Sequence, residues 1–292
     1  MALDTSKVKL PRSVVTHLLN KAKDTSTIAA LSPSEPQKFA DIDHMIFNPT
    51  AEAEVVEEGA KKGSYENSLT PITGKRFKVV TTTRVSDELR WADEDDQLEI
   101  VANIMADQNA AMGRALDYVV YHAVNPKGGG ALSGYTALTD GANTVTATDD
   151  PVADIDSLTD KLIDWDINGF ALAKTFASDL RKLRVPSTGQ RLYPEIPLNL
   201  NVGNIDGINA SASGTVNGKL ATTPTKVLGI MGDFSLIKWG MVRDIWSEII
   251  EYGDPDGTGY DLKAYNQVAF RTEAVFGYAV LDPKGFAVLK SE

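Results

Sequence analysis

The sequence predicts an α+β fold with an extended β-hairpin, one long helix, and a compact α/β region closed by further strands. Three observations carry this prediction. Residues 51–83 are highly charged without one clean apolar face, residues 93–123 carry apolar residues at helical spacing, and short apolar runs alternate with helical segments from about residue 131. Since the charged hairpin has no apolar face to bury, we expect it to lie against a neighbouring molecule.

The composition is that of an ordinary globular chain of 292 residues, with 42% hydrophobic and 24% charged residues. The net charge of −11 disfavours a dedicated nucleic-acid binder, because such proteins gain affinity by neutralising phosphates. The chain has no cysteine, which excludes disulfides, thiolate metal sites and cysteine nucleophiles. It has neither an apolar signal core nor the ~20 consecutive apolar residues that span a bilayer, so a soluble chain is expected.

Residues 1–47 are expected to form an N-terminal arm. Within it, residues 11–23 predict a short helix, because Pro11 suits a first helical turn and the apolar residues that follow share one face. Loop-like composition comes next. A single short amphipathic helix cannot stabilise itself, so this arm must dock on the body or on a neighbouring subunit.

Residues 48–84 are expected to form the extended hairpin, with strands marked by Val55–Val56 and Phe77–Val80. Ten to twelve residues a side would reach roughly 35–40 Å. Two interpretations remain open: a solvated ribbon whose charges pair internally, and an arm whose charges complement a neighbour and so fix its orientation. On the second interpretation, the residues hypothesised to act in inter-subunit assembly are Glu52, Glu54, Glu57, Glu58, Lys61, Lys62, Lys75, Arg76 and Lys78.

Residues 93–123 predict one long helix. The acidic run Asp93–Asp96 lies at its start, where the helix dipole favours negative charge. Apolar residues then recur at spacings near three, four and seven: Leu98, Val101, Met105, Met112, Leu116 and Val119. About thirty residues at 1.5 Å each give ~45 Å, long enough for the backbone of an elongated domain.

Residues 131–228 are expected to form the compact α/β region. Val152–Trp165 and Ser178–Leu183 predict helices, and Phe170–Lys174 predicts a buried strand between them. Residues 204–224 are rich in Gly, Ser and Asn and predict an exposed loop. Further strands are expected at 227–231, 236–251, 266–274, 276–281 and 286–289.

No catalytic, cofactor-binding or metal-binding residue is predicted. His17, His44 and His122 have no second histidine at a ligand spacing and are expected in structural or surface positions. Phosphate-loop, dinucleotide and nucleophile-elbow motifs are lacking, and Asp254–Gly257 predicts a tight turn rather than a calcium loop. The simplest expectation for the tryptophans is the core, and a position near a subunit contact stays open for Trp239 and Trp246, since aromatics are enriched there. The four are Trp91, Trp165, Trp239 and Trp246.

Several short segments follow one another in an order that is typical of one protein family. They are A-E-V-V-E-E-G-A-K-K, F-K-V-V-T-T-T-R-V-S-D-E-L-R, G-R-A-L-D-Y, L-R-K-L-R-V-P-S-T-G-Q-R-L-Y-P, G-D-F-S and Y-A-V-L-D-P-K-G-F-A-V-L. With the order of elements, these segments resemble the major capsid protein of tailed bacteriophages, which has the Hong Kong 97-type fold. The resemblance covers nearly the whole chain.

The resemblance implies a structural shell protein rather than an enzyme. It implies that residues 48–84 are an extended loop lying over a neighbouring subunit, and that residues 85–130 and 229–292 form a peripheral domain with spine helix 93–123. Residues 131–228 would be the axial domain, which meets its copies around five-fold and six-fold centres. Homo-pentamers and homo-hexamers would then close an icosahedral head around double-stranded DNA, without sequence-specific binding.

The resemblance also implies partners. Only about 45 residues precede the hairpin, which implies a separate scaffolding protein or none; a portal and a decoration protein are further expected partners. The virion is assembled in the host cytoplasm, with no membrane and no cofactor. Some relatives cross-link a hairpin lysine to a neighbour's asparagine, but no matching asparagine accompanies Lys61, Lys62 or Lys75, so no cross-link is expected.

Three alternatives remain at this point. An encapsulin-type bacterial compartment shares the fold and would enclose an enzyme cargo. An enzyme with an unrecognised carboxylate site would need convergent acids, which the dispersed acids of this chain do not suggest. A monomeric surface-binding module is disfavoured by the long hairpin.

Overall fold

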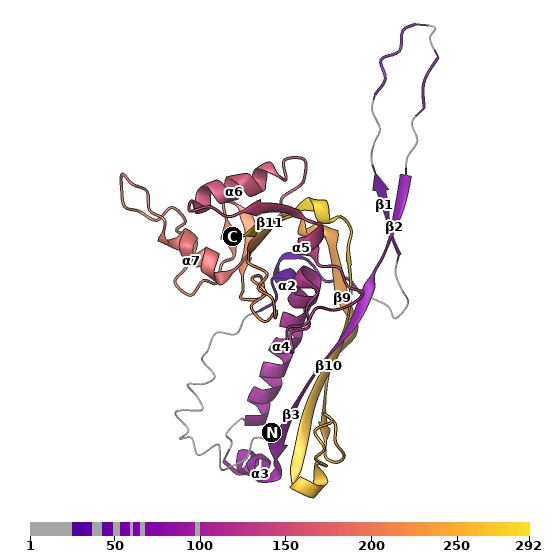
Figure 1. Ribbon diagram of the computed structural model, residues 1–292, viewed down its shortest axis with the longest axis vertical. Helices are drawn as coiled ribbons and strands as arrows, with labels where there is room; N and C mark the ends of the chain where they lie inside the picture. The colour runs from indigo at the N-terminus through magenta and orange to yellow at the C-terminus, as the bar shows by residue number, and fades with distance from the viewer. Residues whose placement is uncertain (1–24, 37–42, 49–52, 59–60, 65–67, 97–99) are drawn as a thin grey trace.

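Figure 1 shows a two-stranded ribbon that leaves the body, an elongated sheet beside a long helix, and a compact lobe. The helix expected at residues 11–23 lies outside the described part of the chain. This computed structural model describes residues 25–36, 43–48, 53–58, 61–64, 68–96 and 100–292.

The elongated sheet has three antiparallel strands in the order β3-β10-β9. They are β3 (Lys75–Ser86), β10 (Gln267–Val280) and β9 (Ile237–Ile250). The two strands expected at 266–274 and 276–281 are one continuous strand, β10. The break between them lies instead in the pairing with β9, whose register shifts on either side of Val275.

The long helix α4 (Ile100–His122) covers one face of this sheet. Phe77 and its register partner Phe276 face the same side, since opposed residues of an antiparallel pair share a face, and their ring centroids lie 5.4 Å apart. Met112 and Leu116 of α4 belong to the same buried cluster. The apolar residues at helical spacing therefore form one stripe of α4, and this stripe is buried against the sheet.

The lobe is built on a six-stranded mixed sheet in the order β4-β11-β8-β5-β7-β6. Its central strand β5 is buried along its whole length, and Phe170, Phe176 and Leu180 fill the core on one side. Its elements are α5 (Leu138–Gly141), β4 (Asn143–Thr146), α6 (Pro151–Asp160), β5 (Gly169–Leu172), α7 (Lys174–Lys182), β6 (Asn204–Ile205), β7 (Ile208–Ala212), β8 (Val227–Gly232) and β11 (Phe286–Lys290). Short 3-10 turns occupy Phe234–Leu236, Lys263–Tyr265 and Pro283–Gly285.

The prediction of a single helix over 93–123 is wrong, because the structure has two helices here. The chain passes from β3 directly into α3 (Asp87–Asp96), and α4 follows as a second helix. Ser86 caps α3, because its Oγ accepts a hydrogen bond from the backbone N–H of Leu89 at 3.3 Å. In Figure 1, α3 lies across the lower end of α4.

The lobe also takes more of the chain than the predicted boundary of 131–228. β8 pairs with β5 and β11, so residues 229–232 and 286–290 belong to the lobe sheet and not to the body with the long helix. Residues 204–224, expected as an exposed loop, contribute β6 and β7 and bury Thr215 completely. Thr215 contacts Asp117 and His122 of α4, a contact that composition alone does not reveal.

A buried carboxylate joins three separate segments of the chain. Asp117 of α4 is fully buried and accepts hydrogen bonds from Ser26 Oγ at 2.6 Å, Thr27 N at 2.8 Å and Ile28 N at 3.3 Å. Thr215 Oγ1 donates a further bond from the lobe. Asp117 thereby fixes the start of α2 (Thr27–Leu31) against the long helix.

The histidines meet the expectation of structural or surface positions where the structure describes them. His44 is half-buried in the ribbon, and His17 lies outside the described residues. His122 is buried, and its Nε2 donates to the carbonyl oxygen of Thr215 at 3.1 Å. Burial lowers the pKa of His122 to about 4 from an ordinary value near 6.5.

This lowered pKa predicts a pH dependence of stability. Between pH 6.5 and pH 4 the unfolded chain binds a proton at His122 and the folded chain does not, so stability falls as the pH falls through this window. We expect a loss of about 2 kcal/mol between pH 7 and pH 4.5. Urea unfolding of the unassembled parent and of His122→Gln, which keeps a donor without titrating, should differ by that amount in their pH dependence. Identical pH profiles would contradict the assignment.

Candidate assembly surfaces

The arm is a ribbon of two antiparallel strands, β1 (Asp43–Asn48) and β2 (Ser68–Thr73). The predicted hairpin strands are wrong. Val55–Val56 lies in coil beyond β1, and Phe77–Val80 belongs to β3 of the elongated sheet. The physical reason is burial: Phe77 packs in the core, so this segment gains more from the sheet than from pairing within the arm.

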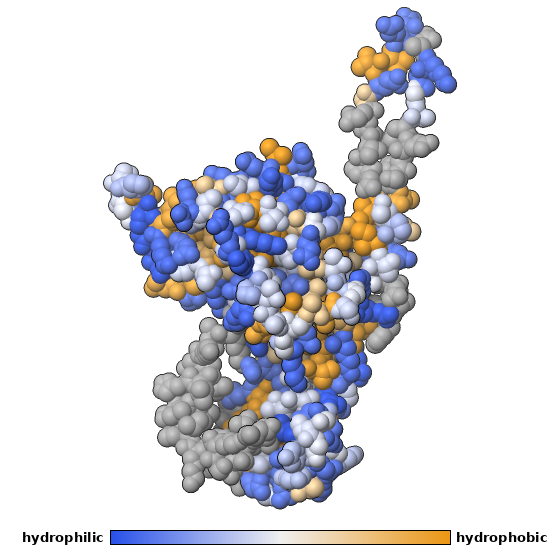
Figure 2. Space-filling view, in the orientation of Figure 1, coloured by the Kyte–Doolittle hydropathy of each residue, from blue (hydrophilic) through white to orange (hydrophobic). Residues whose placement is uncertain are grey.

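One face of the ribbon is apolar and exposed. Phe47 lies opposite Leu69, and Met45 lies opposite Pro71, so these four side chains share a face. Met45, Phe47 and Leu69 are 65%, 58% and 63% exposed. Figure 2 shows this hydrophobic surface where the ribbon leaves the body. The sequence carries a short apolar run here, Met45–Phe47, but the charges further along the arm obscure it.

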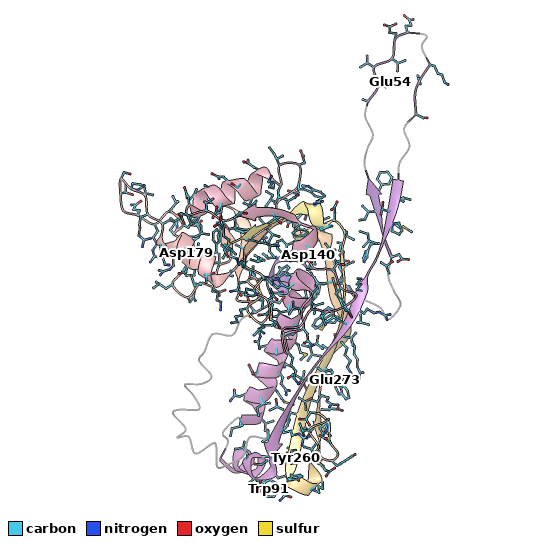
Figure 3. All side chains as sticks on the ribbon, in the orientation of Figure 1. Glu54, Trp91, Asp140, Asp179, Tyr260 and Glu273 are labelled. Carbon is cyan, nitrogen blue, oxygen red and sulfur yellow. The ribbon has the colours of Figure 1, made fainter. Side chains whose placement is uncertain are left out.

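The charged residues of the arm lie beyond the ribbon. Glu54, Glu57 and Glu58 are exposed on the outgoing limb, and Lys61 and Lys62 are exposed on the returning limb. Figure 3 shows Glu54 near the far end of the arm, remote from the body.

Among the described residues of the tip, one hydrogen bond joins the two limbs. Gly63 N donates to Glu54 Oε2 at 3.0 Å. Glu52 lies outside the described residues.

The remaining predicted bases lie elsewhere, at the junction of the arm with the body. Lys75, Arg76 and Lys78 are exposed at the start of β3. Lys75 Nζ donates to the carbonyl oxygen of Gly134, and Lys78 Nζ lies 2.6 Å from Glu273 Oε2. The structure therefore divides the predicted charge cluster into a tip group and a junction group, and it does not bring the two together within one chain.

The turn after β9 has a structural role that the sequence does not reveal. Arg84 is buried, and its Nε lies 2.9 Å from both carboxylate oxygens of Asp256. Its Nη2 donates to Asp254 and its Nη1 to the carbonyl oxygen of Tyr260. The Arg84 guanidinium lowers the pKa of Asp256 to about 2. The predicted turn at 254–257 is thus held by Arg84, which lies on the face of the sheet opposite to α4.

The tryptophans correct another expectation. Trp239 is buried, and its Nε1 donates to the carbonyl oxygen of Ser32 at 3.0 Å, but Trp91 and Trp246 are exposed rather than in the core. No three His, Asp or Glu side chains of the described residues converge as metal ligands. Within the same residues, no helix is long and apolar enough to cross a membrane.

Comparison with known proteins gives one family and several similar structures. The Phage capsid family matches residues 7–291. A structure from Mycobacterium phage Ogopogo is 35% identical, with a TM-score of 0.85 and coverage of 100% of both chains. One from Gordonia phage Cozz is 28% identical, with a TM-score of 0.80 and coverage of 98% of this chain and 92% of that chain.

A more distant structure supports the fold alone. It is described as the capsid of a native GTA particle, is 15% identical, and has a TM-score of 0.59 with coverage of 92% of this chain and 91% of that chain. No curated protein matches the chain.

Proposed function

Because the chain belongs to the phage capsid family and is a major capsid protein, we propose that its copies close into homo-pentamers and homo-hexamers of an icosahedral head around double-stranded DNA. The predicted Hong Kong 97-type α+β fold is confirmed, and so is a structural rather than an enzymatic role. The protein is a component of the virion shell. The phage relatives do not favour the encapsulin-type alternative.

The observation that best supports assembly through the arm is the exposed apolar face of the ribbon. Met45, Phe47 and Leu69 project from a ribbon that stands away from its own body. A contiguous apolar face on a projecting element marks a protein contact. Such a contact gives each subunit a neighbour in one direction, and repeating it around an axis closes a ring.

The parts of the chain receive the roles that the family resemblance implies. The arm that includes β1 and β2 is the extended loop and lies over a neighbouring subunit. The elongated sheet, including β3 from Lys75, forms the peripheral domain with α4, and the lobe is the axial domain at the five-fold and six-fold centres. The lobe includes β8 and β11 because these strands pair within its sheet. Each contact can be weak, since every subunit makes several and closure makes them mutually dependent.

The further partners follow from the same proposal. A separate scaffolding protein and a portal take part in assembly, and a decoration protein binds the finished shell. The net charge of −11 suits a container filled with DNA, because strong attraction to the inner wall would hinder packing. Assembly takes place in the host cytoplasm.

The test is to express the full chain and to follow it by light scattering and negative-stain electron microscopy. Closed shells, or discrete pentamers and hexamers, are the expected result. If only monomers form, the chain is co-expressed with the genes next to its own. Monomers in both experiments would overturn the proposal.

A further inference from the structure

Two arginines face each other across a short hairpin that follows α7. Arg184 and Arg191 form an antiparallel bridge, and Val185 N donates to the carbonyl oxygen of Gln190 at 2.9 Å. Opposed residues of an antiparallel pair carry their side chains on one face, and like charges so placed destabilise it. The Arg184 guanidinium donates to the backbone carbonyl oxygens of residues 181–183, which leave its charge uncompensated.

This arginine pair therefore lacks a counter-charge in the isolated subunit. Among the described residues, no carboxylate forms an ion pair with Arg184 or Arg191. The aspartate of α7, Asp179, is paired instead with Lys182, at 2.8 Å between Oδ1 and Nζ. An acidic surface on another molecule would relieve the repulsion between the two guanidinium groups.

The outer face of α6 carries like charges of the opposite sign. Asp156 and Asp160 are exposed and four residues apart, so they are neighbours on one face of the helix, and such a pair destabilises it. Asp160 is also the last residue of α6, where the helix dipole disfavours negative charge. Asp164 adds a third exposed carboxylate in the turn that follows. In the part of the chain that the structure describes, none of the three forms an ion pair.

Each set of charges adjoins an exposed apolar side chain. Ile163 lies in the sequence between Asp160 and Asp164 and is 81% exposed. Leu192 directly follows Arg191 and is 41% exposed. Protein contacts typically combine an apolar centre with a polar rim. Both surfaces therefore have the make-up of a contact, with rims of opposite charge.

The two surfaces lie on different sides of the lobe. In Figure 1 the hairpin projects at the left, beyond α7, while α6 lies along the top. α6 packs on β4 and β11 at one end of the lobe sheet, and α7 packs on β8 nearer its middle. Complementary surfaces on different sides of one subunit form a head-to-tail contact, which closes a ring when the rotation between copies closes. Because the lobe carries both halves of such a contact, its partner is a second copy of the chain.

We propose that the outer face of α6 in one lobe binds the arginine pair of the next lobe around a ring. The three carboxylates then accept charge-assisted hydrogen bonds from the two guanidinium groups, and Ile163 packs beside Leu192. Each like-charge set is stabilised by the other, and the charges fix which side of a lobe meets its neighbour. This inference rests on the proposed function, in which lobes surround the five-fold and six-fold centres, and it names the side chains that order them.

Charge reversal on either surface tests this contact. The acid variant carries Asp156→Lys and Asp160→Lys, and the base variant carries Arg184→Glu and Arg191→Glu. Each variant brings like charges together between neighbouring lobes, so the subunit concentration needed for pentamers and hexamers should rise at least about a hundredfold. These changes are at the lobe surface, so urea unfolding of each unassembled variant should have a midpoint close to that of the parent.

Combining the two variants provides the matched control. A single chain with all four substitutions has its two charged surfaces exchanged, so pentamers, hexamers and shells should return. An equimolar mixture of the acid and base variants can assemble by alternating the two chains around a ring. Six places can alternate and five cannot, so negative-stain electron microscopy of the mixture should show hexamers without pentamers.

The outcomes separate this inference from the proposed function. Loss of rings in both variants and their return in the combined chain support the contact. Rings of either single variant at the parent's concentration would overturn it while the shell function stands. A combined chain that folds but stays monomeric would also overturn it, because the arginine pair would then bind something other than α6. If the parent and its neighbouring gene products form no shells, the proposed function itself fails.

A neutral variant distinguishes a contact from a structural role. Asp156→Asn with Asp160→Asn removes the like-charge pair of α6, so the unassembled subunit should be at least as stable as the parent. Ring assembly should nevertheless need about tenfold more subunit and should depend less on salt, because salt screens exposed charge pairs. Assembly with the parent's concentration and salt dependence would contradict the contact.

Discussion

Replacement of Asp117 by alanine is expected to leave the chain unable to fold stably. The carboxylate is fully buried and accepts hydrogen bonds from Ser26, Thr27 and Ile28 on the N-terminal side and from Thr215 in the lobe. Without it, several buried donors lose their acceptor at once, and each costs about 1–3 kcal/mol. For these four donors the sum is at least ~4 kcal/mol, a large part of the roughly 5–15 kcal/mol by which domains are typically stable.

The electrostatics of Asp117 make its substitution by asparagine informative. Burial raises the pKa of the Asp117 carboxyl, and the donors around it oppose that rise. An asparagine side chain at this position would keep the shape but turn an NH2 group toward groups that are themselves donors. We therefore expect Asp117→Asn to be destabilised almost as much as Asp117→Ala, because the site needs an acceptor on both oxygens.

The measurement is urea unfolding of the unassembled subunit, followed by circular dichroism. Asn109→Ala is the control, an exposed polar residue on the same helix, and it should lie within about 0.5 kcal/mol of the parent. If the unfolding midpoint of Asp117→Ala lies close to that of the control, water can replace the carboxylate without a loss of stability, and the prediction is wrong.

The sequence predicts those features that depend on local pattern. The stripe that includes Met112 and Leu116 predicts the buried face of α4, and the short apolar run at Phe170 predicts β5. The start of α3 also has a local signal, since Ser86 followed by two acids is typical of a helix N-terminus. The acidic run from residue 93 competes with that signal and indicates a later start, which is wrong.

What the sequence could not predict depends on long-range contacts. Ser26 and Asp117 are 91 residues apart, so no local pattern marks their hydrogen bond. Likewise, no spacing rule reveals that Arg84 binds Asp256, which lies 172 residues later in a turn. The charges predicted as one assembly site are divided between the tip and the junction, because that division depends on where β3 joins its sheet.

The second large effect is expected on assembly rather than on folding. In the triple variant Met45→Thr, Phe47→Thr and Leu69→Thr, the ribbon keeps β-favouring residues but loses its apolar face. These side chains are largely exposed in the isolated subunit, so its unfolding midpoint should stay within the usual range for surface changes, about ±0.5 kcal/mol. Shell formation should be lost at concentrations where the parent assembles.

The size of this loss follows from the area that assembly would cover. Fully burying an exposed large apolar side chain contributes roughly 1.5–3 kcal/mol, and Met45, Phe47 and Leu69 are 65%, 58% and 63% exposed in the subunit, so the three losses weaken each contact by at least ~2.7 kcal/mol. At about 1.4 kcal/mol per tenfold, that is about a hundredfold per contact.

Light scattering and electron microscopy measure whether the triple variant forms shells. The control is a second triple variant that preserves the apolar face, with Met45→Leu, Phe47→Leu and Leu69→Met. Only a role in binding a neighbour predicts that the polar variant folds but stays unassembled while the apolar control forms shells. If the polar variant also forms normal shells, the ribbon face is solvent-exposed in the head, and the subunits must be joined through other surfaces.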